Sequence, residues 1–257
     1  MSGAPGPAPA VTAVTFDAGQ TLIDLDTELL AARLAERGVT VAPAVLQAAA
    51  PQAWRQYDAA VAAGTGGHPW RVLMDALLAG AGQAHAPARG ELVEWLWQEQ
   101  PRKNLWRREV PGMFALARAL RRRGLAVAVL SNSEGALAEL FEEMGWAADF
   151  DVITDSGKVG VEKPDPRIFA LTLARLGASA EHTVHIGDSW PADIEGARGA
   201  GLRAIWFGRH AMASERALPP GQIGRASEAA EVARLLADWG AAEVSLDVTG
   251  AAPGGGR

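Results

Sequence analysis

Short apolar runs alternate with longer amphipathic segments over most of the chain. The runs are too short for helices and are rich in β-branched or large apolar residues, a pattern typical of buried strands. Five strands are predicted in this way, at residues 11–16, 125–130, 152–154, 183–186 and 202–207.

The segments between these runs have the spacing of amphipathic helices. Apolar residues recur at i, i+3, i+4 and i+7 within residues 113–120, and the pattern repeats at 137–144 and 169–176. Ser133, ahead of the second of these helices, is a residue type that often caps helix N-termini. Strands that alternate with helices of this length predict right-handed crossovers and a mostly parallel sheet.

Residues 26–106 interrupt the alternation. No strand pattern is found there, and about 80 residues is too long for a simple crossover connection. Helical stretches are predicted at 27–37, 44–62, 70–78 and 90–98. We therefore expect a helical subdomain inserted after the first strand.

The inserted segment is rich in tryptophan. Five of the nine tryptophans lie in it: Trp54, Trp70, Trp95, Trp97 and Trp106. They could line a substrate pocket, but aromatic side chains more often form the core of a small helical bundle, and we expect the core role.

Composition narrows the functional class. The 257 residues include 24 Lys and Arg against 30 Asp and Glu, a formal net charge of −6. This acidic balance argues against a nucleic-acid-binding surface or attachment to an anionic membrane. The absence of cysteine excludes disulfides, thiolate metal sites and cysteine nucleophiles.

The two ends of the chain differ in composition from the rest. Residues 1–10 and 240–257 are rich in small residues, proline and glycine, and we expect a disordered N-terminal tail and a flexible C-terminal tail. The first residues lack the basic start and apolar run of a signal peptide, and no stretch of about 18 apolar residues occurs. We therefore expect a cytoplasmic location.

Polar and charged residues follow the predicted strands. Because ligands bind at the carboxyl ends of the strands in open α/β sheets, these residues are candidates for a site. They are Asp17 after the first strand, Ser131 and Asn132 after the second, Lys158 and Lys163 in the loop after the third, and Asp188 and Asp193 after the fourth.

This set of side chains favours one kind of chemistry. Converging carboxylates without cysteine or clustered histidine favour a hard cation with oxygen ligands, above all Mg²⁺. A cation, a lysine and hydroxyl donors suit a dianionic phosphoryl group, and Asp17 could be a nucleophile that forms an aspartyl-phosphate. Any one of these acids alone could be a helix cap or turn residue. Their common position at one sheet edge favours a site.

Four segments, in this order, resemble the four motifs of the haloacid dehalogenase (HAD) superfamily. They are Asp17-Ala-Gly-Gln-Thr-Leu22, Ser131-Asn132, Lys163-Pro-Asp-Pro and Gly187-Asp-Ser-Trp-Pro-Ala-Asp193. The inserted helical segment resembles the cap of the first subclass of this superfamily. The resemblance implies a Rossmann-like α/β core at 11–25 and 107–239, with strand order 5-4-1-2-3, and an inserted α-helical cap at 26–106.

The resemblance also implies a metal site. Asp17 would be both nucleophile and metal ligand, and Gly19 would offer its backbone carbonyl to Mg²⁺. Asp188 would bind the metal through its carboxylate. Asp193 would assist directly or through water.

A phosphoryl site is implied by the second and third motifs. Ser131, Asn132 and Lys163 would bind the phosphoryl group of a small phosphorylated substrate. Lys163 would also compensate the negative charge of Asp17. Of the two lysines in the loop, the Lys-Pro-Asp-Pro context favours Lys163 over Lys158.

The first motif departs from the pattern of the superfamily's phosphatases. These enzymes usually have a second aspartate, serving as general acid and base, at the position of Gly19. Glycine has no proton to donate, and general acid–base help is typically worth about 10²–10⁴-fold in rate. Three hypotheses remain: substrates with good leaving groups, a substitute acid such as Asp24 or Asp26, or a catalytically weak protein that mainly binds its ligand.

A 2-haloacid dehalogenase is a further alternative, because it also uses an aspartate nucleophile. The pattern that those enzymes resemble has a tyrosine at the position of Gly19, and its last motif lacks the paired acids that bind a metal. Two acids such as Asp188 and Asp193, with no metal to hold, would form a costly cluster of like charge. The phosphatase hypothesis is therefore preferred, while the motifs specify neither the substrate nor the oligomeric state.

Histidine offers no further site by spacing. His185 lies inside an apolar run and is expected to be a hydrogen-bonded core residue, and the other four histidines lack metal-ligand spacing.

Overall fold

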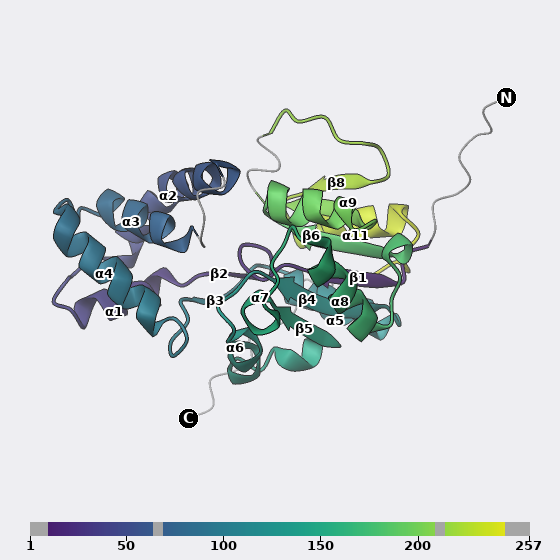
Figure 1. Ribbon diagram of the computed structural model, residues 1–257, viewed down its shortest axis with the longest axis horizontal. Helices are drawn as coiled ribbons and strands as arrows, with labels where there is room; N and C mark the ends of the chain where they lie inside the picture. Colours follow the sequence, from purple (N-terminus) through teal and green to yellow (C-terminus); the bar gives the residue numbers. More distant parts are fainter. Residues whose placement is uncertain (1–9, 64–68, 209–213, 245–257) are drawn as a thin grey trace. The chain divides into compact units, whose positions relative to one another are not determined.

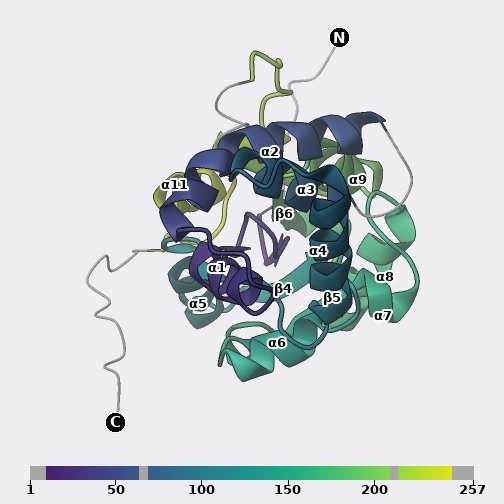
Figure 2. The ribbon, with the colours of Figure 1, turned by 90° about the vertical axis from the view of Figure 1, so that its left-hand side faces the viewer.

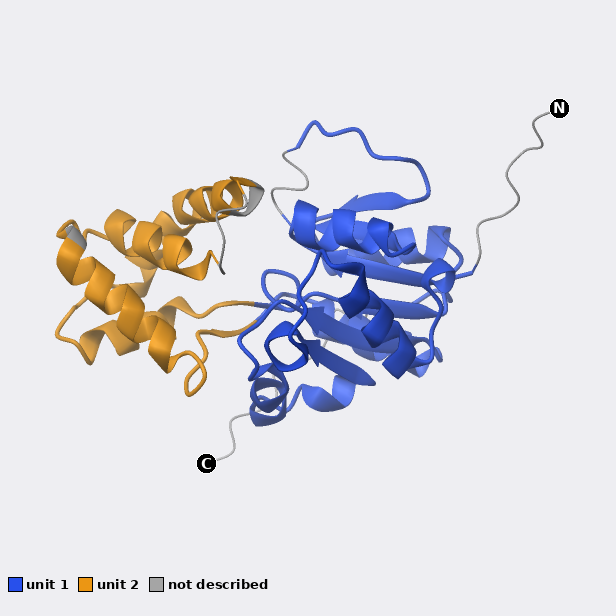
Figure 3. Ribbon diagram, viewed as in Figure 1, with its two compact units in different colours: residues 1–23, 109–257 blue, residues 24–108 orange. Residues whose placement is uncertain are grey.

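The computed structural model describes residues 10–63, 69–208 and 214–244 (Figure 1). The chain forms two compact units, coloured separately in Figure 3. Unit 1 comprises Met1–Ile23 and Glu109–Arg257, and unit 2 comprises Asp24–Arg108. Apart from Ala10 and residues 240–244, the two expected tails lie outside the described residues.

Unit 1 contains a six-stranded parallel sheet. Its strands are β1 (Ala13–Phe16), β4 (Ala126–Ser131), β5 (Val152–Asp155), β6 (Thr183–Gly187), β7 (Arg203–Phe207) and β8 (Ile223–Ala226). The spatial order is β5-β4-β1-β6-β7-β8, and every neighbouring pair is parallel. The order expected for the five predicted strands is confirmed, as is the α/β fold class.

The strand β8 was not predicted. Its four residues include Gly224 and Arg225, so it lacks an apolar run. A Cβ at Gly224 would lie 2.7 Å from the end of the Leu235 side chain, so the helix of residues 229–238 packs closely on this strand. The strand is recognised by its pairing with β7 and its contact with that helix, which no local pattern shows.

Helices pack on both faces of the sheet. The α-helices in the described part of unit 1 are α5 (Met113–Arg122), α6 (Leu137–Glu143), α7 (Ser156–Val159), α8 (Pro166–Leu176), α9 (Gly196–Gly199) and α11 (Ala229–Asp238). Helix α8 contacts α9, and α5 contacts α11. Because the chain reverses its direction across the sheet after β5, right-handed crossovers place these two pairs on opposite faces. Both faces of the central strand β1 are thus covered, and all its residues are buried.

The expected cap of α6 is wrong. The N-cap position is Ala136, and Ser133 instead donates a hydrogen bond to Asp155 at 3.3 Å. Gly135, at φ 96°, turns the chain between Ser133 and the helix, so the serine lies too far back. The carboxylate of Asp155 accepts from Leu137 N at 3.0 Å and replaces the expected cap.

Within its described residues, unit 2 contains four helices, α1 (Thr27–Ala35), α2 (Pro43–Ala63), α3 (Trp70–Gly80) and α4 (Ala86–Glu99). Each helix packs against the next in sequence, α1 on α2, α2 on α3 and α3 on α4 (Figure 2). Two short strands, β2 (Ile23–Leu25) and β3 (Trp106–Glu109), pair where the chain passes between the units. None of the helices in the described ranges is long and apolar enough to cross a membrane.

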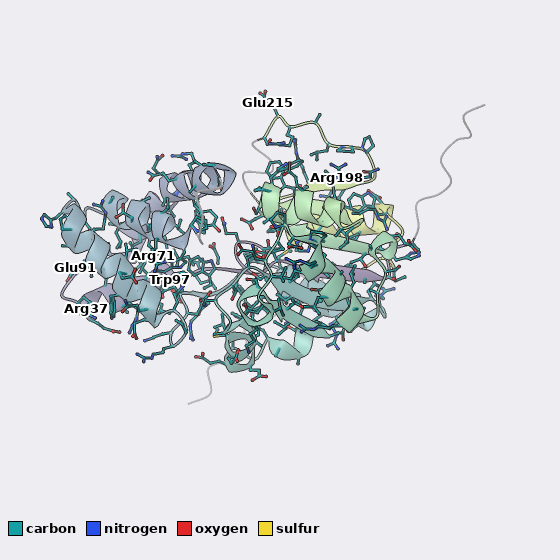
Figure 4. All side chains as sticks on the ribbon, viewed as in Figure 1. Arg37, Arg71, Glu91, Trp97, Arg198 and Glu215 are labelled. Carbon is teal, nitrogen blue, oxygen red and sulfur yellow. The ribbon has the colours of Figure 1, made fainter. Side chains whose placement is uncertain are left out.

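The tryptophans of unit 2 belong to its core. Trp70 is buried, and its ring centroid lies 5.4 Å from that of Trp97. The guanidinium of Arg71 lies 4.4 Å from the ring of Trp97, and Figure 4 labels both residues on the neighbouring helices α3 and α4. Trp54, Trp95 and Trp106 are half-buried against the same cluster.

Candidate active site

The carboxyl ends of the central strands meet at one edge of the sheet. Phe16 of β1 is in register with Val129 of β4 and Ile186 of β6. Asp17 therefore leaves β1 at the level where β4 and β6 end, and its backbone N–H donates to Ile186 O at 2.8 Å. The sheet register brings together residues that are more than 100 positions apart in the chain.

Asp17 is held by two donors. Its Oδ1 accepts from Ser131 Oγ at 2.9 Å and from Lys163 Nζ at 2.6 Å. The side chain is buried, and burial raises the pKa of the Asp17 carboxyl above its ordinary value while the Lys163 ammonium opposes this shift. Three residues singled out in the sequence thus form one hydrogen-bonded group.

Lys163 lies between two carboxylates. Its Nζ is 2.6 Å from Asp17 Oδ1 and 2.5 Å from Asp193 Oδ1. Burial alone would lower the pKa of Lys163, but the two carboxylates raise it well above its ordinary value. Lys158, the other lysine considered, instead pairs with Glu139 at the surface.

Asn132 binds the backbone of Lys163. Its Oδ1 accepts from Lys163 N at 2.8 Å, and its Nδ2 donates to Lys163 O at 2.9 Å. The side-chain amide expected to contact a phosphoryl group therefore fixes the position of the lysine that follows β5.

Three carboxylates converge at the same edge. One oxygen from each of Asp17, Asp188 and Asp193 lies within 4.8 Å of the others, and all three residues are buried. Burial alone would raise the pKa of Asp193, but Lys163 and His185 hold it well below its ordinary range. Three acids against the single ammonium of Lys163 leave surplus negative charge. An all-oxygen donor set with this surplus fits a hard divalent cation.

Asp188 is oriented by two residues from other elements. Its Oδ2 accepts from Gln20 Nε2 at 2.7 Å, and its backbone carbonyl accepts from Trp206 Nε1 at 2.8 Å. Gln20 has φ 55°, in the left-handed region that few non-glycine residues adopt. It lies in the tight turn after Asp17 that also contains Gly19, where Gln20 N donates to Ile23 O at 2.7 Å.

The two acids considered as substitutes for the missing aspartate accept hydrogen bonds from backbone N–H groups in unit 2. Asp26 accepts from Glu28 N and Leu29 N and caps α1. Asp24 accepts from Leu25 N at 2.8 Å.

Three residues that hold site residues or their loops in place were not identified as such from the sequence. Trp206 lies within a predicted strand, and nothing in an apolar run reveals that an indole N–H donates to Asp188. Asp155 directly follows the predicted third strand, and this position could have identified it as a candidate. His185 was recognised only as a core histidine.

Residues 11–201 match the family model of the haloacid dehalogenase-like hydrolases, so the chain belongs to this family and is a hydrolase. It is 37% identical to phosphoserine phosphatase of Thermus thermophilus over 174 residues, which cover 65% of this chain and 67% of that protein. It is 29% identical to human haloacid dehalogenase-like hydrolase domain-containing protein 3 over 203 residues, 75% of this chain and 80% of that protein.

Solved structures share the fold. A magnesium-bound HAD hydrolase of Bacillus subtilis aligns with a TM-score of 0.64 and 24% identity, covering 89% of this chain and 99% of that chain. A HAD family hydrolase of Deinococcus radiodurans, solved with phosphate and sodium, aligns with a TM-score of 0.57 and 23% identity, covering 93% of this chain and 100% of that chain. At these identities the likeness concerns the fold alone.

Proposed function

We propose that this hydrolase is an Mg²⁺-dependent phosphatase that acts on a small phosphorylated molecule through an aspartyl-phosphate on Asp17. The observation that carries the proposal is the pair of donors on Asp17, Ser131 Oγ at 2.9 Å and Lys163 Nζ at 2.6 Å. A hydroxyl and an ammonium beside a buried carboxylate suit a nucleophile that must meet an anionic substrate. The phosphatase name of the relative from Thermus thermophilus agrees with this chemistry.

The reaction would proceed in two steps. An oxygen of the Asp17 carboxylate attacks the phosphorus, and the bond between phosphorus and the leaving-group oxygen breaks, with its electron pair going to the leaving group. Water then hydrolyses the acyl phosphate, which releases inorganic phosphate and restores the carboxylate. Oδ1 of Asp17 accepts hydrogen bonds from Ser131 and Lys163, whereas Oδ2 accepts none from the described residues. Oδ2 is therefore the oxygen proposed to attack.

The residues proposed to hold Mg²⁺ are Asp17, Asp188 and Asp193 with the backbone carbonyl of Gly19. When bound, the cation supplies positive charge that offsets the repulsion between an anionic nucleophile and an anionic substrate. Lys163 contributes a fixed charge of the same sign and keeps Asp17 and Asp193 in place.

Gly19 restricts the proposed substrates. Without a side-chain acid at this position, the leaving group must depart without a proton from Gly19. Acyl phosphates, phosphoanhydrides and esters of acidic alcohols meet this condition, since their leaving groups are stable anions. The helical unit of residues 24–108 is proposed to be a cap that excludes water and selects among these compounds.

A panel of phosphomonoesters, acyl phosphates and 2-haloacids, with and without Mg²⁺, tests the proposal. We expect phosphate release that requires Mg²⁺, is greatest for acyl phosphates and falls at least 10³-fold in Asp17→Asn, by analogy with the loss of other nucleophiles (about 10³–10⁶-fold). The control is Asp149→Asn, which alters a partly buried carboxylate that pairs with Arg118 and not with the site residues, and it should keep full activity.

Three results would contradict the proposal. Full turnover by Asp17→Asn would exclude Asp17 as nucleophile. Halide release without Mg²⁺ would favour a dehalogenase, and no reaction with any compound would favour a catalytically weak binding protein.

A further inference from the structure

A line of buried hydrogen bonds leads from β1 to Asp193. Thr15 Oγ1 lies 2.8 Å from His185 Nδ1, and His185 Nε2 lies 3.1 Å from Asp193 Oδ1. Thr15 and His185 are register partners on the neighbouring strands β1 and β6, so their side chains project from the same face of the sheet. Each of these three side chains is at least 99% buried.

The chemistry of the carboxylate fixes the direction of the hydrogen bond between His185 and Asp193. An ionised carboxylate only accepts hydrogen bonds, so His185 Nε2 must carry the proton that it shares with Asp193. On the other side of the ring, Nδ1 of His185 lies 2.8 Å from the hydroxyl of Thr15, which can donate or accept a hydrogen bond. Thr15 thus fixes the orientation of the ring, and the ring in turn orients the carboxylate.

Asp193 is oriented by donors from three different segments. Oδ1 accepts from His185 Nε2 and from Lys163 Nζ, and Oδ2 accepts from Ser189 N at 2.8 Å. Gly187, at the end of β6, makes room for this carboxylate, because a Cβ there would lie 2.3 Å from Asp193 Cγ. The position of the carboxylate is therefore defined from several sides.

We propose that Thr15 and His185 are positioning residues for the reaction, and not simply hydrogen-bonded core residues. They hold Asp193 in the orientation in which it keeps Lys163 on Asp17 and presents its carboxylate to the cation. This inference rests on the proposed function. Neither residue is assigned contact with substrate or metal.

The alternative is a purely structural role. A histidine that only satisfies polar atoms in the core would affect folding stability, and a folded variant would bind Mg²⁺ and turn over substrate normally. A positioning role predicts instead that cation affinity and kcat depend on the N–H at the place of Nε2, even among variants of equal stability.

The test compares His185→Gln, which keeps an N–H donor near the place of Nε2, with His185→Leu, which removes it. Thr15→Ser and Thr15→Val form the matched pair at the other end of the line. Calorimetry measures Mg²⁺ binding, and hydrolysis of acetyl phosphate with saturating Mg²⁺ gives kcat and KM. We expect His185→Leu and Thr15→Val to weaken Mg²⁺ binding and to lower kcat by about 10–100-fold with little change in KM. We expect His185→Gln and Thr15→Ser to remain within about 3-fold of the original chain.

A measurement on the metal-free protein with its native sequence does not depend on any variant folding. In ¹⁵N-edited NMR spectra the ring of His185 should carry a proton on Nε2 that is protected from exchange. A ring without a proton on Nε2 would overturn the proposal. So would a folded His185→Leu variant with unchanged Mg²⁺ affinity and kcat.

The two proposals fail in different ways. If the chain hydrolyses no phosphorylated compound while the Nε2 proton and the effect of His185→Leu on Mg²⁺ binding are as expected, the proposed function is wrong and the positioning of Asp193 stands. If hydrolysis occurs and is indifferent to His185 and Thr15 in folded variants, the positioning role is wrong and the proposed function stands.

Discussion

Lys163 Nζ lies 2.6 Å from Asp17 Oδ1, although 146 positions separate the two residues in the chain. The same ammonium lies 2.5 Å from Asp193. Lys163 therefore separates two buried carboxylates that would otherwise repel each other, and it fixes the oxygen of Asp17 that already accepts from Ser131. Lys163 therefore contributes both to the stability of the site and to its proposed chemistry.

Replacing Lys163 by methionine should affect both properties. Removing one partner of a buried ion pair leaves an uncompensated charge, which typically costs about 3–5 kcal/mol. Lys163→Met should lower the free energy of unfolding by that amount and abolish Mg²⁺-dependent phosphate release. Urea unfolding and a phosphate assay measure the two effects.

Lys158→Met is the matched control, since it removes a lysine of the same loop that pairs with Glu139 at the surface. It should leave the urea midpoint and the activity unchanged. If Lys163→Met unfolded at the same urea concentration as Lys158→Met, the buried ion pair would not stabilise the fold.

Gly187→Ala tests the close approach of Asp193 to the sheet. The added Cβ would lie 2.3 Å from Asp193 Cγ, a distance that requires the carboxylate to move. We expect a loss of stability of about 1–3 kcal/mol, as for other overpacked sites, together with weaker Mg²⁺ binding. Thermal unfolding and calorimetry are the measurements.

Gly199→Ala in α9 provides the opposite case, because nothing lies within 4 Å of the added Cβ and the residue is helical. Alanine is favoured over glycine in helices by about 0.5–1 kcal/mol, so this variant should be more stable than the original chain. Equal behaviour of the two variants would contradict the packing argument.

Gln20→Met should separate cation affinity from folding. Methionine has nearly the same length and would adopt the same left-handed backbone conformation, but it cannot donate to Asp188 Oδ2. A partner of a metal-binding carboxylate is typically worth about 10–100-fold in affinity. We expect such a loss in Mg²⁺ affinity by calorimetry with little change in melting temperature, and an unchanged affinity would exclude a positioning role for Gln20.

Much of this architecture could be predicted because it depends on local patterns. Apolar runs located five strands, and the residues that follow those strands included Asp17, Ser131 and Asp188. The strand order followed from the resemblance to the HAD superfamily. The misplaced cap at Ser133 and the missed strand β8 both depend on contacts beyond the local pattern, a glycine turn in one case and packing against α11 in the other.

The hydrogen-bond partners of the site could not be predicted in the same way. Whether Trp206 donates to Asp188, or Thr15 hydrogen-bonds to His185, depends on the register between strands that are distant in sequence. Periodicity shows which face a residue occupies, but not which side chain of the neighbouring strand it meets.

Stability should depend on pH through Glu231. The backbone N–H and hydroxyl of Ser227 donate to its carboxylate and hold the pKa of Glu231 below the ordinary 4.5. A pKa lowered by folding gives stability that is present above the unfolded-state value and is lost as the pH falls through the folded-state value. Between about pH 5 and 3 the original chain should therefore lose more stability than Glu231→Gln.

Urea titrations at each pH measure the difference. Glu228→Gln is the control, because the side chain of Glu228 makes no capping hydrogen bond at its N-cap position. Parallel curves for the original chain and Glu231→Gln would contradict the prediction.

Asp155 should be essential for the loops that carry the second and third motifs. Its carboxylate accepts from Gly135 N at 3.1 Å, Leu137 N at 3.0 Å and Gly157 N at 2.9 Å, and it is buried. Asn at this position keeps the shape but replaces one acceptor oxygen by a donor group that faces backbone N–H groups. Because buried polar groups left without partners typically cost about 1–3 kcal/mol each, Asp155→Asn should lower the free energy of unfolding by at least that amount.

Asp155→Asn should also affect the site, because one of these loops follows Ser131 and the other precedes Lys163 in the chain. We expect Asp155→Asn to reduce phosphate release more than Mg²⁺ affinity, because the three acids proposed to bind the metal lie on other segments. Asp151→Asn is the comparison: its carboxylate accepts from Val127 N at 2.8 Å and pairs with Arg121 at the surface, away from the motif loops. A folded Asp155→Asn protein with the activity of Asp151→Asn would show that the loops hold their shape without this carboxylate.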